Sequence, residues 1–202
     1  ATALSFTSLA RAWDWLPASD NNRTLVTDFP VKLTQPSTSS SGTKLTAPQL
    51  ESLANQPYLL YNYISTGYNA TKVQRAVIML HGLGRDAWAY FDLTRESLLN
   101  ATSRTERTSH RSRLRFDEVV VMAPVFMNLE DPGCYPVDDQ KSPTSNALVW
   151  DSSSWAQGAD SVYPDNVYDA DGKPFRPPGV SAYEALDAAV AWFSNKTMFP
   201  NM

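Results

Sequence analysis

The stretch Ala76-Val77-Ile78-Met79-Leu80-His81-Gly82-Leu83-Gly84-Arg85-Asp86 determines the fold that we expect for this chain of 202 residues. Five consecutive apolar residues stop at a His-Gly-x-Gly sequence, and a helix-like segment follows from Ala87. Such an uninterrupted apolar run is typical of a strand that is buried on both faces of a sheet. The glycines after it allow backbone N–H groups to approach a ligand closely. We therefore expect a strand, a functional turn and a helix in succession.

The turn contains the residue types that a site for negative charge requires. In acyl transfer, negative charge develops on a carbonyl oxygen, and backbone N–H groups aimed at that oxygen stabilise it. The N–H groups of Gly82 and Leu83 are the candidates for this role, and an ordinary turn that requires glycine is the alternative. We expect His81 to be structural because it ends the strand. Arg85 and Asp86 are expected to pair with each other or to fix the turn.

Periodicity and capping patterns predict strands at residues 23–34, 58–65, 73–80 and 119–123, and helices at 46–54, 87–100 and 181–195. The strands at 73–80 and 119–123 are both continuous apolar runs joined by a segment that contains a helix. This pattern predicts that the two strands are parallel neighbours in one sheet. The last helix is expected to present an apolar face made of Tyr183, Leu186, Val190 and Phe193.

The chain is expected to form one domain over residues 23–202, after an N-terminal extension of residues 1–22. Residues 126–179 contain seven prolines and predict a long turn-rich insertion, which is usually functional. Within it, Trp150 and Trp155 are candidates for an apolar substrate wall, with a role in the core as the alternative. The segment 169–172 contains a fragment of a calcium loop but lacks carboxylates at the first and last loop positions, so a tight Asp-Gly turn is predicted.

Several features are typical of a secreted protein. The sequence begins with Ala1, which we interpret as the result of signal-peptide removal. Four glycosylation sequons predict N-linked glycans, at Asn22, Asn69, Asn100 and Asn195. Cys134 is the single cysteine, so it is expected to pair with a cysteine of another chain or to be a buried free thiol.

Composition argues against several classes of function. The net charge of −4 is unfavourable for a general nucleic-acid binder. The arginine-rich segment 103–115 lacks interleaved aromatic residues for base stacking, so a surface loop is expected. No apolar run approaches the roughly 20 residues that a membrane span needs. We expect neither a metal ion nor an organic cofactor.

The ordered set of motifs resembles secreted fungal α/β-hydrolase-fold proteins and their bacterial relatives. The resemblance covers about residues 23–202 and includes the His81–Asp86 turn, the strand that ends at Ala123-Pro124, and the segment from Trp150 to Gly158. It implies an α/β fold with a mostly parallel central sheet and flanking helices, of which this chain would be the N-terminal part. It also implies that Gly82 and Leu83 form the oxyanion hole.

In such proteins a Gly-His-Ser-x-Gly-Gly nucleophile elbow comes next, and the catalytic acid and histidine follow. This chain has no Gly-x-Ser-x-Gly sequence, and His110 is its last histidine. We therefore expect a C-terminal segment or a second chain to complete the fold and supply the triad, giving a secreted enzyme that hydrolyses a small ester or related acyl substrate. The alternatives are a non-catalytic binding protein on the same fold and a glycan-binding module built on Trp150 and Trp155.

Overall fold

A computed structural model describes residues 15–32, 44–55, 58–104, 115–140 and 143–202 of the chain. Most of the N-terminal extension 1–22 lies outside the described residues, as do residues 33–34 of the first expected strand and most of the arginine-rich segment 103–115. The three α-helices described are α1 (Ala47–Asn55), α2 (Ala87–Arg104) and α3 (Ala182–Phe193).

The central element is a four-stranded sheet in the order β1-β4-β6-β5. Its strands are β1 (Arg23–Val26), β4 (Asn62–Ser65), β5 (Arg75–Ile78) and β6 (Val119–Pro124). β5 and β6 pair in parallel, which confirms the prediction for these two neighbours. β4 is antiparallel to both β6 and β1. The expectation of a mostly parallel sheet is therefore wrong for the described residues, because apolar runs indicate burial but do not determine strand direction.

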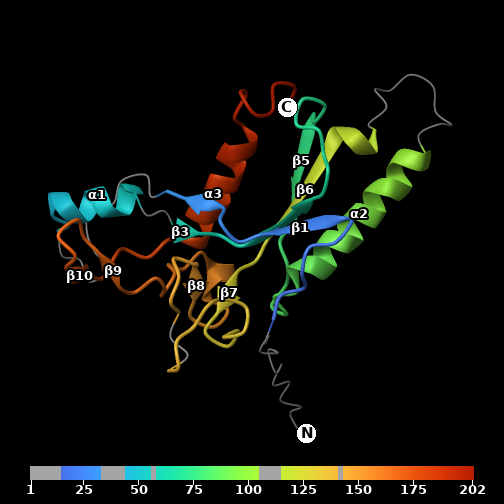
Figure 1. Cartoon of the computed structure of the whole chain (residues 1–202). Coiled ribbons are helices and arrows are strands. Elements are labelled where there is room, and N and C mark those ends of the chain that lie inside the picture. The colour runs from blue at the N-terminus through green and yellow to red at the C-terminus, as the bar shows by residue number, and fades with distance from the viewer. Residues whose placement is uncertain (1–14, 33–43, 56–57, 105–114, 141–142) are drawn as a thin grey trace, which may run out of the picture.

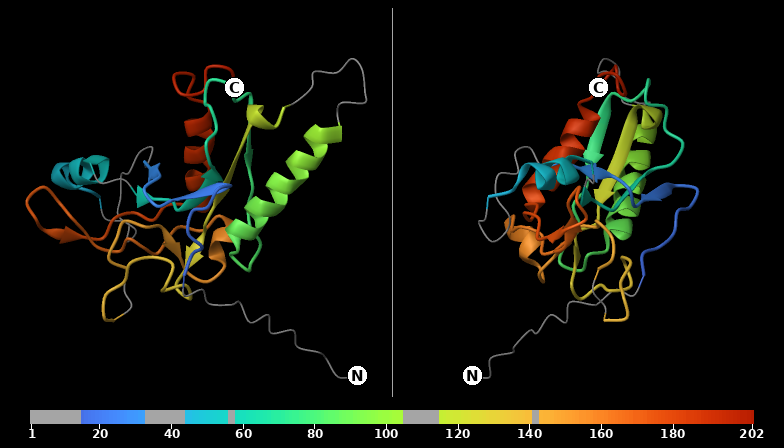
Figure 2. Two further views of the ribbon diagram at one scale, coloured as in Figure 1. Left: turned by 45° about the vertical axis from the view of Figure 1, so that its right-hand side comes forward. Right: turned by 60° about the vertical axis from the view of Figure 1, so that its left-hand side comes forward.

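Strand β6 lies between two hydrophobic cores. Its side chains alternate, so Val120 and Met122 join one buried cluster, whereas Val121 and Ala123 join the other. The first cluster includes residues of α3, and the second includes Phe91 of α2. Figures 1 and 2 accordingly show α2 and α3 on opposite sides of the sheet. This arrangement explains why the sequence of β6 is continuously apolar.

Two expected strands are each interrupted. The segment 23–34 forms β1 and then the short β2 (Pro30–Val31), which pairs with β3 (Tyr58–Leu59) outside the main sheet. Residues 58–65 form β3 and β4, separated at Leu60 and Tyr61. Leu60 donates its N–H to the Phe29 carbonyl, and the Tyr61 carbonyl accepts from Val125 N–H, so each residue pairs with a different neighbour.

Helix α2 extends beyond the expected end at Asn100 to Arg104. The Thr102 hydroxyl donates to the Leu98 carbonyl, and the Ser103 hydroxyl donates to the Asn100 carbonyl. These contacts satisfy hydroxyl groups within the helix, so polar residues in its last turn do not end it.

Helix α3 begins at the predicted capping box. The Ser181 side chain accepts from the helix backbone, and the Glu184 carboxylate accepts from Ser181 N–H at 3.1 Å. The expected apolar face is confirmed only in part: Phe193 is buried and Leu186 packs against the core, whereas Tyr183 is 61% exposed and Val190 is also exposed. The residues of α3 that are buried are Ala182, Ala185, Ala189 and Phe193. Alanines permit close packing of the helix on the core, which a count of large apolar residues does not predict.

The segment 126–179 contributes both core and surface. β7 (Met127–Asn128) and β8 (Val149–Trp150) form a buried parallel pair, and the short 3₁₀ helix η3 (Ser154–Gln157) follows. β9 (Val167–Tyr168) and β10 (Pro174–Phe175) form a hairpin. In its turn, Gly172 N–H donates to the Asp169 carbonyl at 2.9 Å, which confirms the predicted Asp-Gly turn. A second 3₁₀ helix, η2 (Phe116–Glu118), leads into β6.

Gly158 is expected to tolerate substitution by alanine less well than Gly67. It has φ +76°, and a Cβ atom there would lie 2.6 Å from Cδ2 of Tyr183. Gly67 has a similar φ of +68° but has no atom within 4 Å of the same position. Both alanine variants lose about 1–2 kcal/mol from the left-handed backbone, and only Gly158→Ala adds a steric cost. Urea unfolding should show the larger loss for Gly158→Ala; equal losses would contradict this explanation.

Candidate functional site

The turn at residues 81–86 lies at the carboxyl end of β5, immediately before α2. Gly82 is half-buried, and Leu83 is 55% exposed. The Gly82 carbonyl accepts from Arg85 N–H at 3.0 Å, which closes the turn, and it also contacts Nδ1 of His81 at 2.8 Å. The turn therefore has one carbonyl that is fixed by two donors.

His81 connects this turn to the chain that follows β6. Its Nε2 accepts a hydrogen bond from Phe126 N–H at 2.9 Å. Because a backbone amide can only donate, Nε2 is unprotonated, and Nδ1 carries the proton that is donated to Gly82. The ring is buried and lies edge-on to Phe126 and Trp155. His81 thus has the structural role that its place at the strand end predicts.

The fixed Gly82 carbonyl also determines where the next amide points. A trans peptide is planar, so the Leu83 N–H points in the direction opposite to the Gly82 C=O. Since that carbonyl faces His81 and Arg85, the Leu83 N–H faces away from both. Among the described residues, neither Gly82 nor Leu83 donates its N–H to a protein acceptor. The turn therefore presents backbone donors that are held in position and are available.

Arg85 fixes the other side of the turn. Its Nε and Nη2 donate to the two carboxylate oxygens of Asp131 at 2.7 and 3.0 Å, and its Nη1 donates to the Leu83 carbonyl at 3.1 Å. Asp131 also accepts from Asn128 N–H at 3.0 Å. Arg85 therefore fixes the turn, which was one of its two predicted roles, but its ion-pair partners are Asp131 and, at 3.6 Å, Glu130, neither of which the sequence predicted. No local motif marks a partner 46 residues away.

This ion pair is deeply buried, with Arg85 2% and Asp131 1% exposed. Arg85 also has φ +58°, a left-handed conformation that is uncommon for a residue with a side chain. Burial makes a two-point contact between guanidinium and carboxylate strongly directional, since neither group has water as an alternative partner. The surrounding contacts therefore hold Arg85 in an unfavourable backbone conformation, and the loop geometry is determined by tertiary structure.

The two tryptophans lie in the aromatic core beside the turn. Trp150 is completely buried, and its indole N–H donates to the Ala159 carbonyl at 2.9 Å. Trp155 is nearly buried and stacks on Phe126, with ring centroids 5.2 Å apart. Both side chains belong to the cluster around β6 and α3. Their contribution to a substrate wall stays a prediction.

The remaining predicted site residues lie apart from the turn. Cys134 is buried and forms no disulfide among the described residues, and its pairing with another chain stays a prediction. The four sequon asparagines are exposed, and they are Asn22, Asn69, Asn100 and Asn195. Within the described part of the chain, no cluster of three His, Cys, Asp or Glu side chains has the geometry of a metal site. None of the described helices has the length and apolar character of a membrane span.

Acidification should destabilise the protein through His81. Burial lowers the pKa of His81 below its usual value near 6.5, and the hydrogen bond to the Gly82 carbonyl opposes this effect only in part. Below pH 6.5 the unfolded state therefore binds a proton that the folded state does not, so stability falls by up to about 1.4 kcal/mol per pH unit. Urea unfolding between pH 7.5 and 5.5 should show a smaller decrease for His81→Gln. A His110→Gln control that removes the same dependence would contradict the assignment to His81.

Comparison with known proteins gives no match to any family model, to any curated protein or to any solved structure.

Proposed function

We propose that this chain is the N-terminal part of a secreted α/β-hydrolase-fold serine hydrolase that acts on a small ester or related acyl substrate. The supporting observation is the turn after β5, where the Gly82 carbonyl is fixed inward and the Leu83 N–H is consequently aimed outward without a protein acceptor. The parallel β5–β6 pair and the helix after the turn are consistent with such a fold. A C-terminal segment would supply the serine, the acid and the catalytic histidine.

The proposed reaction begins when a serine Oγ of the C-terminal segment attacks the substrate carbonyl carbon. The serine proton passes to a histidine base of that segment, and the C=O π electrons move to the oxygen. The N–H groups of Leu83 and Gly82 donate to this oxyanion. The intermediate then expels the alcohol, which takes the proton from the histidine, and water repeats the sequence to release the acid. His81 is not the base, because its Nε2 lone pair already accepts from Phe126 N–H.

Labelling with a serine-directed fluorophosphonate tests the location of the nucleophile. The protein from its natural source is labelled and its peptides are mapped. Label on a serine outside residues 1–202 supports the proposal. Activity-dependent label on a serine within residues 1–202 would contradict it, and a complete lack of label would favour the non-catalytic binding protein.

Substitution of Leu83 tests the oxyanion donor directly. Leu83→Pro removes the backbone N–H, and we expect the hydrolysis rate to fall about 10²- to 10³-fold, the usual effect of removing one oxyanion donor. Leu83→Ala keeps the N–H and removes only an exposed side chain, so its rate should stay close to that of the wild type. Ester hydrolysis is compared for both variants after circular dichroism has shown them to be folded. Equal rates would exclude this donor.

A further inference from the structure

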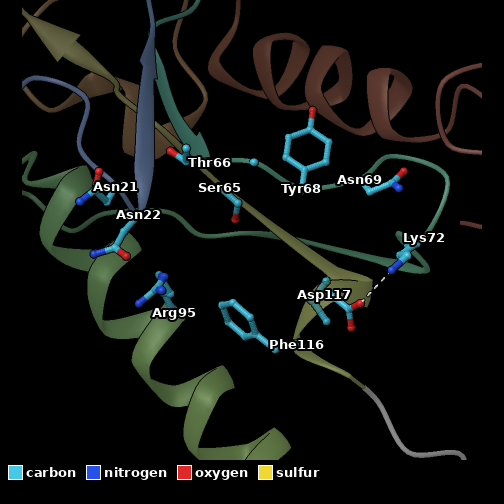
Figure 3. Close-up of a pocket in the computed structure, with 12 residues that line it drawn as sticks. Asn21, Asn22, Ser65, Thr66, Tyr68, Asn69, Lys72, Arg95, Phe116 and Asp117 are labelled. Carbon is cyan, nitrogen blue, oxygen red and sulfur yellow. Dashed lines mark ion pairs between the residues drawn. The ribbon is translucent and has the colours of Figure 1, made fainter.

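A cavity lies at the opposite end of the sheet from the Gly82 turn. It has a volume of about 290 Å³ and is lined by residues that precede β5 and β6, including Lys72 and Phe116, whereas the turn follows β5. Because β5 and β6 are parallel, their starts lie at one edge of the sheet and the turn lies at the other. This cavity, shown in Figure 3, is lined by none of the residues of the turn and is therefore separate from the proposed oxyanion site.

The walls of this cavity combine an aromatic surface with hydrogen-bond donors. The guanidinium of Arg95 lies 5.4 Å from the Phe116 ring, and both side chains are half-buried. Among the described residues, Arg95 forms no ion pair or hydrogen bond, so its N–H groups remain available to an acceptor. Asn21 adds an exposed amide, and an ion pair between Lys72 and Asp117 closes one end. An aromatic face beside amide and guanidinium donors suits a neutral ring that bears hydroxyl and acetamide groups.

Two of the four sequon asparagines lie on the wall of this same cavity. Asn22 and Asn69 flank it in Figure 3, and both are exposed. The Asn69 Oδ1 accepts from the N–H and the hydroxyl of Thr71 at 3.0 and 2.7 Å. These contacts fix Oδ1 as the acceptor, so Nδ2, the atom that carries an N-linked sugar, remains free. Asn195 has the same contact with Thr197 N–H at 3.0 Å but does not line the cavity.

We propose that the cavity binds the first N-acetylglucosamine of an N-glycan carried by Asn22 or Asn69. Attachment forms a bond between the asparagine Nδ2 and the anomeric carbon of a lipid-linked diphosphate oligosaccharide, while the lipid diphosphate leaves and Nδ2 loses a proton. The apolar face of the sugar packs on Phe116, and its acetamide carbonyl accepts from Arg95. The covalent tether supplies a high effective concentration, so a weak contact is sufficient to occupy the cavity.

Removing one sequon at a time shows whether Asn22 or Asn69 carries the bound sugar, and each sequon can be removed without replacing its asparagine. Thr24→Ala prevents glycosylation of Asn22, and Thr71→Ala prevents that of Asn69. Each variant is produced in a secretory host and, without glycan, in a bacterial host. The bacterial protein measures the effect of the substitution itself, and site occupancy in the secreted protein is determined by mass spectrometry.

The decisive measurement is a thermodynamic cycle between the glycan and Phe116. We expect Phe116→Ala to raise the equilibrium constant of unfolding about 2- to 12-fold more in the glycosylated protein than in the unglycosylated one, the range of one contact on an aromatic ring. This difference should disappear in either Thr24→Ala or Thr71→Ala, which identifies the source. Two control substitutions should leave this effect of the glycan on Phe116→Ala unchanged. Trp15→Ala changes an aromatic residue that does not line the cavity, and Asn195→Gln removes a sequon that does not line it.

A spectroscopic measurement on unsubstituted Phe116 makes the test independent of the folding of the variant. An endoglycosidase trims the glycans to single N-acetylglucosamine residues, and the N-acetyl methyl signal of the seated sugar should be shifted by the Phe116 ring. Absence of glycan at both Asn22 and Asn69, a cycle without coupling, or unshifted methyl signals would each overturn the proposal. The proposal rests on the secretion that the proposed function includes, but none of these readouts requires hydrolase activity, so its failure is distinguishable from failure of the proposed reaction.

Discussion

Replacing Asp131 by alanine is expected to destabilise the protein by about 3–5 kcal/mol, because it removes the two-point carboxylate contact of the buried Arg85 guanidinium and leaves the half-exposed Glu130 carboxylate, at 3.6 Å, as its remaining acidic neighbour. The same change removes the acceptor of Asn128 N–H and releases the side chain that holds the Leu83 carbonyl. The free energy of unfolding from urea titration measures the loss. In the proposed enzyme, hydrolysis should decrease as well, because the Leu83 N–H would lose its fixed direction.

Two comparisons show whether burial is the cause of this large effect. The exposed pair of Lys72 and Asp117, at 3.5 Å, provides a matched surface control, and Lys72→Ala should cost less than about 1 kcal/mol. The double variant Arg85→Met with Asp131→Leu replaces both charges by apolar groups and should be more stable than Asp131→Ala alone. A small loss in Asp131→Ala, similar to that in Lys72→Ala, would contradict the buried ion pair.

Trp150→Ala is expected to lower the free energy of unfolding by about 3–5 kcal/mol, because it leaves a large cavity between β6 and α3. The Trp150 ring is completely buried against Phe126, with centroids 5.2 Å apart, and its N–H is paired with Ala159. Trp15→Ala, at a side chain that is 60% exposed, should change stability by no more than about 0.5 kcal/mol. Thermal or urea unfolding distinguishes the two. Near-equal losses would show that Trp150 is not a core residue.

The sequence predicts elements whose pattern is local. The continuous apolar run 119–123 predicts β6 because both of its faces are buried, and the spacing of Ser181 and Glu184 predicts the start of α3. The sequence does not predict that β4 runs antiparallel to β6, since an apolar run is compatible with either strand direction. The sequence predicts the burial of Phe193 in α3 but not that of the alanines, which determine packing there more than the larger Tyr183 does.

The candidate site likewise has some features that the sequence predicts and others that it does not. The glycines at 82 and 84 mark the turn, and the place of His81 at the strand end indicates its structural role. The partners that fix the turn do not follow from any local pattern, because Phe126 and Asp131 are 45 and 46 residues away from the residues they contact. Tertiary packing also determines the exposed fraction of Trp150, for which the sequence left both a substrate wall and the core as possibilities.

The distant supports of the turn limit its use in protein design. A peptide or a grafted loop that contained only residues 76–90 would lack the Phe126 N–H that fixes His81 and the Asp131 carboxylate that fixes Arg85. Without them, Arg85 would tend to leave its left-handed conformation, and the Leu83 amide would no longer have one orientation. A transplant would therefore need the β5 turn and the segment after β6 together, held at their present separation by a parallel pair of strands.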